Sequence, residues 1–181
     1  PAATHKSVLR LMRYITADGA ISDEGCTAIL AAISAAMRVA EQEGIEELLP
    51  FATSAIREAA NGPELLERIR TETGVDLQVL SGEDEARLTF LAVRRWSGWS
   101  SGSILLLDIG GGSLEIASGA DEYPEVAVSV PLGAGRSTIG FLPDDPPRDD
   151  QLDALRDHAR STLATAVDRF PHRRSDEHVI G

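Results

Sequence analysis

The sequence predicts an α/β fold, in which short apolar strands alternate with amphipathic helices. Residues 104–107 form an unbroken apolar run, ILLL, which is typical of a buried strand. After three glycines a second, alternating apolar segment follows, and two such segments joined by a glycine-rich connection predict a hairpin. Apolar residues at helical spacing between residues 22 and 44, and again from residue 149, predict helices before and after this hairpin.

Composition and charge narrow the class of protein. The chain has 181 residues, is 43% apolar and carries a formal net charge of −12, which suits one large domain or two small lobes. Such an acidic chain is a poor non-specific binder of nucleic acid or anionic membrane. Cys26 is the only cysteine, which excludes an internal disulfide and fits a reducing compartment. No apolar stretch approaches a membrane span and no signal peptide is visible, so we expect a cytoplasmic protein.

The first half of the chain is expected to contain four helices and two short strands after a weakly patterned opening. Ser22 and Ser81 are predicted N-caps, because each precedes acidic residues and an apolar helical pattern. The predicted helices cover residues 22–44, 55–60, 63–74 and 81–96, and the predicted strands cover residues 48–52 and 75–79. Residues 1–20 predict an edge strand or a loop.

In the second half, residues 97–102 (SGWSSG) have the composition of a linker and divide residues 1–100 from 101–181. A third alternating strand at residues 126–130 makes the hairpin part of an antiparallel meander. The segments that follow are a second glycine-rich turn at 131–136, a rigid loop at 143–147, a long helix from about Asp149, a loop at 171–177 and the start of a strand at 178–181.

The glycine-rich connection of the hairpin is a candidate phosphate site. Three consecutive glycines, residues 110–112, contribute no packing and suit a place where backbone approaches a ligand. Their amides can point into one concavity and bind an anion. Asp108 before them, and Ser113 and Glu115 after them, favour this interpretation over a plain tight hairpin turn, because a carboxylate at the strand end can hold a divalent cation or a water.

Two further groups are candidates for phosphate chemistry. Arg57 lies in a short helix after a strand that ends in hydroxyl residues, but from the local pattern alone a plain surface helix is favoured. Residues 83–85 (EDE) open a helix, where carboxylates suit the helix dipole. The functional alternative is a general base that faces the glycine loop, and the pattern does not choose among Glu83, Asp84 and Glu85.

Four stretches resemble, in order and spacing, motifs of the exopolyphosphatase/guanosine pentaphosphatase (Ppx/GppA) family. They are residues 52–59 (ATSAIREA), 81–88 (SGEDEARL), 108–115 (DIGGGSLE) and 130–136 (VPLGAGR). Residues 88–96 (LTFLAVRRW) look most like the short actinobacterial exopolyphosphatases. The resemblance covers nearly the whole chain and implies ribonuclease-H-like lobes of the actin/Hsp70/sugar-kinase superfamily, with mixed sheets flanked by helices.

The resemblance also implies roles for residues of this chain. Glu85 corresponds to the family's catalytic base and Arg57 to an arginine that faces its active cleft. The phosphate-binding loop corresponds to Gly110, Gly111, Gly112 and Ser113, and its flanking carboxylates, implied to organise Mg²⁺ or Mn²⁺ and water, are Asp108 and Glu115.

Two departures from the family pattern bear on domain organisation. The family's first phosphate motif, of the form D-x-G-S-[NT], is absent, and the chain stops near Gly181, before a TSKT-like segment. We therefore expect a fragment of a two-lobe fold, with residues 1–100 as the remainder of the first lobe and 101–181 as the first part of the second. The sequence does not decide whether this fragment is active by itself.

The leading hypothesis is hydrolysis of the terminal phosphoanhydride of inorganic polyphosphate. Guanosine pentaphosphate, a nucleotide of the stringent response, is an alternative substrate, because both activities share these motifs. A non-catalytic sensor that binds polyphosphate or an alarmone and an ATP-dependent kinase of the same superfamily are further alternatives. A homodimer is expected by analogy with the family.

Overall fold

The computed structural model describes residues 4–170 and 178–181, and it confirms the α/β class. The chain forms two compact units, Pro1–Val79 and Leu80–Gly181. The loop predicted at 171–177 lies outside the described residues. Among the described helices, none is long and apolar enough to cross a membrane.

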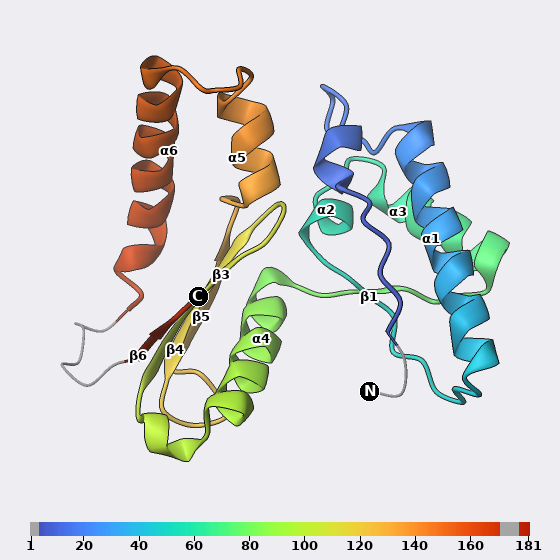
Figure 1. The fold of residues 1–181 in the computed structure, drawn as a ribbon, viewed down its shortest axis with the longest axis horizontal. Coiled ribbons are helices and arrows are strands. Elements are labelled where there is room, and N and C mark those ends of the chain that lie inside the picture. Colours follow the sequence, from blue (N-terminus) through green and yellow to red (C-terminus); the bar gives the residue numbers. More distant parts are fainter. Residues whose placement is uncertain (1–3, 171–177) are drawn as a thin grey trace. The chain divides into compact units, whose positions relative to one another are not determined.

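The first unit is mainly helical, with a two-stranded parallel sheet (Figure 1). Its elements are η1 (Leu11–Tyr14), α1 (Asp23–Gln42), β1 (Phe51–Ala52), α2 (Ser54–Arg57), α3 (Gly62–Thr73) and β2 (Gln78–Val79). Residues 1–20, predicted as an edge strand or a loop, contain the 3-10 helix η1, and the residue after it, Ile15, forms an isolated antiparallel bridge with Ile21. A core that includes Ile29, Leu65 and Ile69 packs α1 against α3.

Local capping explains where the helices of this unit begin and end. The Ser22 side chain accepts a hydrogen bond from the Gly25 amide at 3.2 Å, which confirms the predicted N-cap of α1. Gly74 adopts a left-handed conformation just after α3, as glycine commonly does at a helix end. Asn61 does not cap α3. Its side-chain amide instead bonds the backbone N–H and C=O of Ile21, at 2.8 and 2.9 Å.

The second unit holds the predicted meander within a four-stranded mixed sheet of order β5-β4-β3-β6 (Figure 1). Its elements are α4 (Gly82–Ser97), η2 (Trp99–Ser101), β3 (Ile104–Ile109), β4 (Leu114–Gly119), β5 (Val126–Val130), α5 (Ala134–Phe141), α6 (Asp149–Val167) and β6 (His178–Ile180). Strands β3, β4 and β5 are antiparallel neighbours, as predicted, and β6 adds parallel to β3.

Helix α5 was not predicted from the sequence pattern. The second glycine-rich turn, expected at 131–136, continues into this helix from Ala134. Two glycines and β-branched residues give residues 134–141 (AGRSTIGF) a low intrinsic helix propensity. Tertiary hydrogen bonds to the glycine loop, described below, supply the stabilisation that the local sequence lacks.

Alternation along the strands divides the sheet of the second unit into two apolar faces. Ile104, Leu106, Ala117 and Ala127 pack with Ala86 and Phe90 of α4 on one face. On the other face, a second cluster contains residues of β4 and β5 together with Ala166 of α6. Helices α4 and α6 therefore cover opposite faces of the sheet (Figure 1).

The predicted linker at 97–102 is an ordered part of the second unit. The buried guanidinium of Arg94 donates to the carbonyl oxygens of Gly98, Gly102 and Ala120, with distances of 2.5 Å to Gly102 and 3.2 Å to Ala120. These bonds join the end of α4 to the segment that leads into β3. The compact units consequently divide between Val79 and Leu80, ahead of α4.

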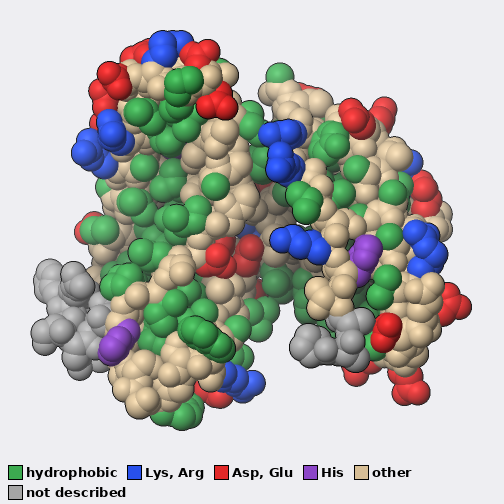
Figure 2. Space-filling model, in the orientation of Figure 1, with side chains coloured by type: hydrophobic (Ala, Val, Ile, Leu, Met, Phe, Trp, Pro, Cys, Tyr) green, Lys and Arg blue, Asp and Glu red, His purple; other side chains and the backbone are tan. Residues whose placement is uncertain are grey.

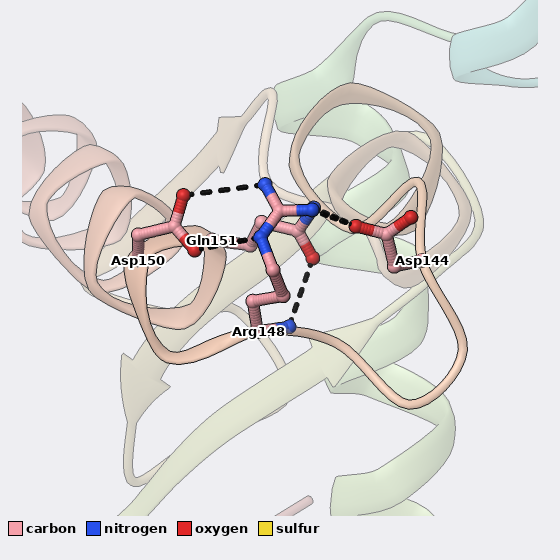
Figure 3. A network of polar contacts seen from close by, with 4 residues as sticks. All are labelled: Asp144, Arg148, Asp150 and Gln151. Carbon is pink, nitrogen blue, oxygen red and sulfur yellow. Dashed lines mark hydrogen bonds and ion pairs between the residues drawn. The ribbon is translucent and has the colours of Figure 1, made fainter.

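A polar network fixes the start of α6, which begins at Asp149 as predicted (Figure 3). The Gln151 side chain accepts from the Arg148 backbone amide at 3.0 Å and donates to Asp144 at 2.7 Å. The Arg148 guanidinium donates to Asp144 and Asp150. These contacts connect the loop at residues 143–147 to the first turn of α6.

Candidate functional site

The second unit places a row of polar side chains across three strands at one end of its sheet. In the register of the ladder, Asp108 lies opposite Glu115, and Glu115 lies opposite Ser129. The next row toward the interior is the apolar set Leu106, Ala117 and Ala127. Because side chains two residues apart along a strand point to the same face, the polar row lies on the face that α4 covers.

Glu115 is a buried carboxylate within this row, with a relative exposure of 1%. Burial raises the pKa of Glu115, because desolvation disfavours its charged form. Hydrogen bonds from the hydroxyls of Ser113 and Ser129 act in the opposite direction on that pKa, and the Ser129 bond measures 2.7 Å. The negative charges of Glu85 and Asp108 raise the same pKa further.

Glu85 lies close enough to Glu115 for its negative charge to act on the pKa of Glu115, as does the charge of Asp108, its ladder neighbour. Glu85 lies in the first turn of α4, one residue before Ala86, which packs on the sheet. The two other acidic residues of that turn are exposed and engaged elsewhere. Glu83 forms an ion pair with Arg87 at 2.6 Å, and Asp84 accepts from the Ser81 hydroxyl at 2.6 Å. Among the three acids that the sequence pattern left open, the fold therefore directs Glu85 toward the carboxylates at the sheet end.

The glycine loop connects β3 to β4. A two-residue hairpin would close with two reciprocal backbone hydrogen bonds between Gly110 and Ser113, and this loop forms one of them. The Gly110 amide donates to the Ser113 carbonyl at 2.9 Å. The Gly110 carbonyl accepts instead from the Ala134 amide of α5, also at 2.9 Å. The carbonyls of Gly111 and Gly112 likewise accept from the Gly133–Arg136 segment. The two glycine-rich motifs of the sequence thus pack together, backbone to backbone.

Steric contact explains why residue 133 is glycine, but it does not explain why residue 111 is glycine. A Cβ atom at Gly133 would lie 2.5 Å from the backbone of Gly112, so the close approach of the two segments requires glycine there. A Cβ at Gly111 would meet nothing within 4 Å, and Gly111 does not adopt a left-handed conformation. Folding therefore does not demand glycine at 111, whereas a ligand that approaches the backbone would.

Of the eight residues to which the family resemblance assigns roles, seven lie in the second unit at this sheet end. These are Glu85, Asp108, Gly110, Gly111, Gly112, Ser113 and Glu115. Arg57 is in the first unit, at the end of α2, where its guanidinium lies 3.7 Å from the Glu58 carboxylate and is 21% exposed. The roles that the family resemblance implied for all eight residues remain predictions.

Three residues at the site were not among the candidates. Ser129 holds Glu115, and Gly133 and Arg136 hold the glycine loop. The signal for the last two was present as the second glycine-rich turn, which follows a strand of the same meander. The Ser129 contact depends on strand register, which residue composition alone does not fix.

The carboxylates at the sheet end fit a hydrated divalent cation better than an all-protein metal cage. Within the described residues, no group of three or more His, Cys, Asp or Glu side chains is arranged to hold a metal ion. Mg²⁺ is usually bound by one or two carboxylates together with waters and substrate phosphates. Asp108 and Glu115, adjacent in the ladder, could supply those carboxylates. Glu115 is already engaged by two hydroxyls, so Asp108 is the better-placed ligand.

Two mycobacterial proteins are similar to this chain in sequence. "Exopolyphosphatase 1" of Mycobacterium tuberculosis H37Rv is 52% identical over 164 residues, which are 91% of this chain and 48% of that protein. "Exopolyphosphatase 1" of Mycobacterium leprae is 51% identical over 166 residues, 92% of this chain and 49% of that protein. The chain thus spans about half the length of these relatives.

Solved structures agree with this relationship. A Ppx/GppA family member from Aquifex aeolicus has a TM-score of 0.67 at 26% identity, covering 88% of this chain and 52% of that one. An exopolyphosphatase from Cytophaga hutchinsonii has a TM-score of 0.76 at 26% identity, covering 84% and 50%. Residues 2–181 match the Ppx/GppA phosphatase family model. The chain belongs to the Ppx/GppA phosphatase family.

Proposed function

We propose that the full-length protein is an exopolyphosphatase, which hydrolyses the terminal phosphoanhydride of inorganic polyphosphate and releases phosphate. The observation that carries the proposal is the grouping of Asp108, Glu115 and the glycine loop at one sheet end, with Glu85 near enough for its charge to raise the pKa of Glu115. Family membership and the names of the mycobacterial relatives support the substrate class. The proposal covers the full-length protein, because the chain spans half of those relatives.

The proposed roles follow from what phosphoryl transfer requires. Catalysis of this reaction depends on positioning and on stabilising negative charge. Backbone amides of the loop at Gly110, Gly111, Gly112 and Ser113 would bind the terminal phosphoryl group, and Arg57 would contribute a further positive charge. Glu85 would orient a water for in-line attack and accept its proton.

Metal ions are the second proposed component of the site. Figure 2 shows acidic side chains on the surfaces of both units, consistent with a net charge of −12. A polyphosphate anion therefore needs local neutralisation in order to approach. We propose Asp108 and Glu115 as the residues that would hold Mg²⁺ or Mn²⁺. The metal would neutralise charge on the phosphoryl oxygens.

Guanosine pentaphosphate remains the alternative substrate, because its terminal phosphoanhydride presents the same chemistry. A non-catalytic polyphosphate or alarmone sensor is less well supported, since a sensor has no need for a carboxylate in the position of Glu85. We further propose a cytoplasmic location, in keeping with the buried free thiol of Cys26, and a homodimer by analogy with the family.

Substrate choice is tested by phosphate release from the full-length protein with Mg²⁺. We expect release from long-chain polyphosphate, and slower release from guanosine pentaphosphate at equal concentration of terminal phosphate. Faster release from guanosine pentaphosphate would reassign the protein as an alarmone phosphatase. Binding of either compound without release would favour the sensor.

A further inference from the structure

We infer that Arg136 is a positioning residue that orients the amides of the glycine loop toward a phosphoryl group. The inference rests on the proposed function and adds a residue to the same site. Its guanidinium Nε donates to the Gly112 carbonyl at 2.7 Å, and its backbone amide donates to the Gly111 carbonyl at 3.0 Å. Arg136 thereby holds two successive peptide units of the loop.

Together with its neighbours, Arg136 engages every carbonyl of the three glycines. The Ala134 amide bonds Gly110 at 2.9 Å, and the Gly133 amide bonds Gly112 at 3.3 Å. Four donors from one short segment thus fix three consecutive carbonyls. A tight hairpin turn would not need this arrangement, because it would close with reciprocal bonds between Gly110 and Ser113.

The orientation of the carbonyls determines the orientation of the amides. A trans peptide unit is planar, so its C=O and N–H point in opposite directions. The three units concerned are trans. When the carbonyls of residues 110–112 point to the Gly133–Arg136 segment, the amides of residues 111–113 point away from it. Within the described residues these three amides form no hydrogen bond to a protein acceptor.

Three consecutive amides that point the same way form a concave anion site of the kind that backbone nests provide. The bond from Arg136 Nε sets the last of these units, which carries the Ser113 amide. Lysine at position 136 would keep the positive charge but not this planar donor, because its ammonium is a point charge on a flexible stem. The positioning role therefore predicts that charge alone does not replace Arg136.

The test compares full-length wild type with Arg136→Met, Arg136→Lys and Arg160→Met. Arg160 is an exposed residue of α6, paired with Asp157, and serves as the matched control. Phosphate release from polyphosphate is measured with Mg²⁺, and thermal unfolding checks the fold. We expect kcat/KM to fall about tenfold or more in both Arg136 variants, which is less than the roughly 10²- to 10³-fold cost of losing a donor that itself contacts developing charge, because Arg136 acts through the loop. Arg160→Met should match wild type.

A second readout follows the loop itself. In ¹⁵N-labelled protein, tripolyphosphate should shift the amide signals of Gly111, Gly112 and Ser113, most strongly at the exposed Gly111. In either Arg136 variant these shifts should shrink. Wild-type kcat/KM and shifts in Arg136→Met, or full recovery in Arg136→Lys, would overturn the positioning role. If Arg136→Met does not fold, the lysine variant alone decides. No release and no shift in wild type would overturn the proposed function instead.

Discussion

Glu115 shows how a single buried carboxylate links stability to the site. Its side chain is held between two hydroxyls, and burial raises its pKa in the folded state. The folded protein therefore retains a proton at Glu115 at pH values where the unfolded chain has released it. Stability from this group is present at low pH and is lost as pH rises through the folded pKa.

Replacement of Glu115 by glutamine tests that linkage. Glu115→Gln keeps an acceptor for Ser129 but removes the titration, so the pH-dependent loss of unfolding free energy due to this group should disappear. The advantage of the variant over wild type should then grow as pH increases. Urea unfolding across pH 4–9 with EDTA present measures this difference. An advantage that shrinks as pH rises would contradict the sign of the pKa shift.

Substitution of Gly111 should change ligand affinity without lowering stability. Because a Cβ at this position meets nothing within 4 Å and φ is not left-handed, Gly111→Ala should fold with equal or slightly greater stability, by up to about 1 kcal/mol. Affinity for tripolyphosphate should fall by about tenfold or more, because the methyl group would occupy the space next to the amides.

Gly140→Ala is the matched control for this experiment. Gly140 lies in α5 with open space around its Cα, so alanine there should also be tolerated, while tripolyphosphate binding stays at the wild-type level. Titration calorimetry measures both affinities. Equal affinities of the two variants would show that the loop does not need a bare backbone at 111.

At the scale of elements, Arg94 connects α4 to the sheet. It is 1% exposed and donates to three backbone carbonyls and to the Ser101 hydroxyl, at 2.7 Å for the last. Arg94→Met would remove the guanidinium that donates to the Gly102 and Ala120 carbonyls and should lower the unfolding free energy by about 3 kcal/mol. Arg95→Met, one residue along and exposed, should leave the unfolding free energy unchanged. Similar values for the two variants in urea unfolding would refute the role of Arg94.

The elements that sequence predicts well are those whose signals are local. The N-caps at Ser22 and Ser81 and the meander of three alternating strands occur as expected. Residues 48–52 and 75–79 were predicted as strands, but only Phe51–Ala52 and Gln78–Val79 pair. Strand length depends on the partner strand, which lies more than twenty residues away in the chain.

The rest of the site depends on the same kind of distant contact. Helix α5 is stabilised through bonds to the glycine loop, and Ser129 meets Glu115 only through register. Glu85 is distinguished from Glu83 and Asp84 by the packing of α4 on the sheet. Residue types identified the glycine loop as a candidate, but the segment that orients it became evident only in the fold.

At the scale of the whole molecule, each compact unit has its own core. Ile69 is fully buried in the first unit, and Phe90 is fully buried in the second. Ile69→Ala should cost about 2–5 kcal/mol and should raise amide hydrogen exchange in the first unit only. Phe90→Leu should raise amide hydrogen exchange in the second unit only. Exchange that rises equally in both units for either variant would show one cooperative structure.

We propose that Glu85 serves as the general base of a polyphosphate hydrolase. Phosphate release from long-chain polyphosphate with Mg²⁺ tests this role, using full-length wild type, Glu85→Gln and the control Glu83→Gln. We expect Glu85→Gln to fold normally and to lose about 10²- to 10⁴-fold in turnover, whereas Glu83→Gln should stay within about twofold of wild type. Wild-type turnover in a folded Glu85→Gln variant would show that Glu85 is not the general base.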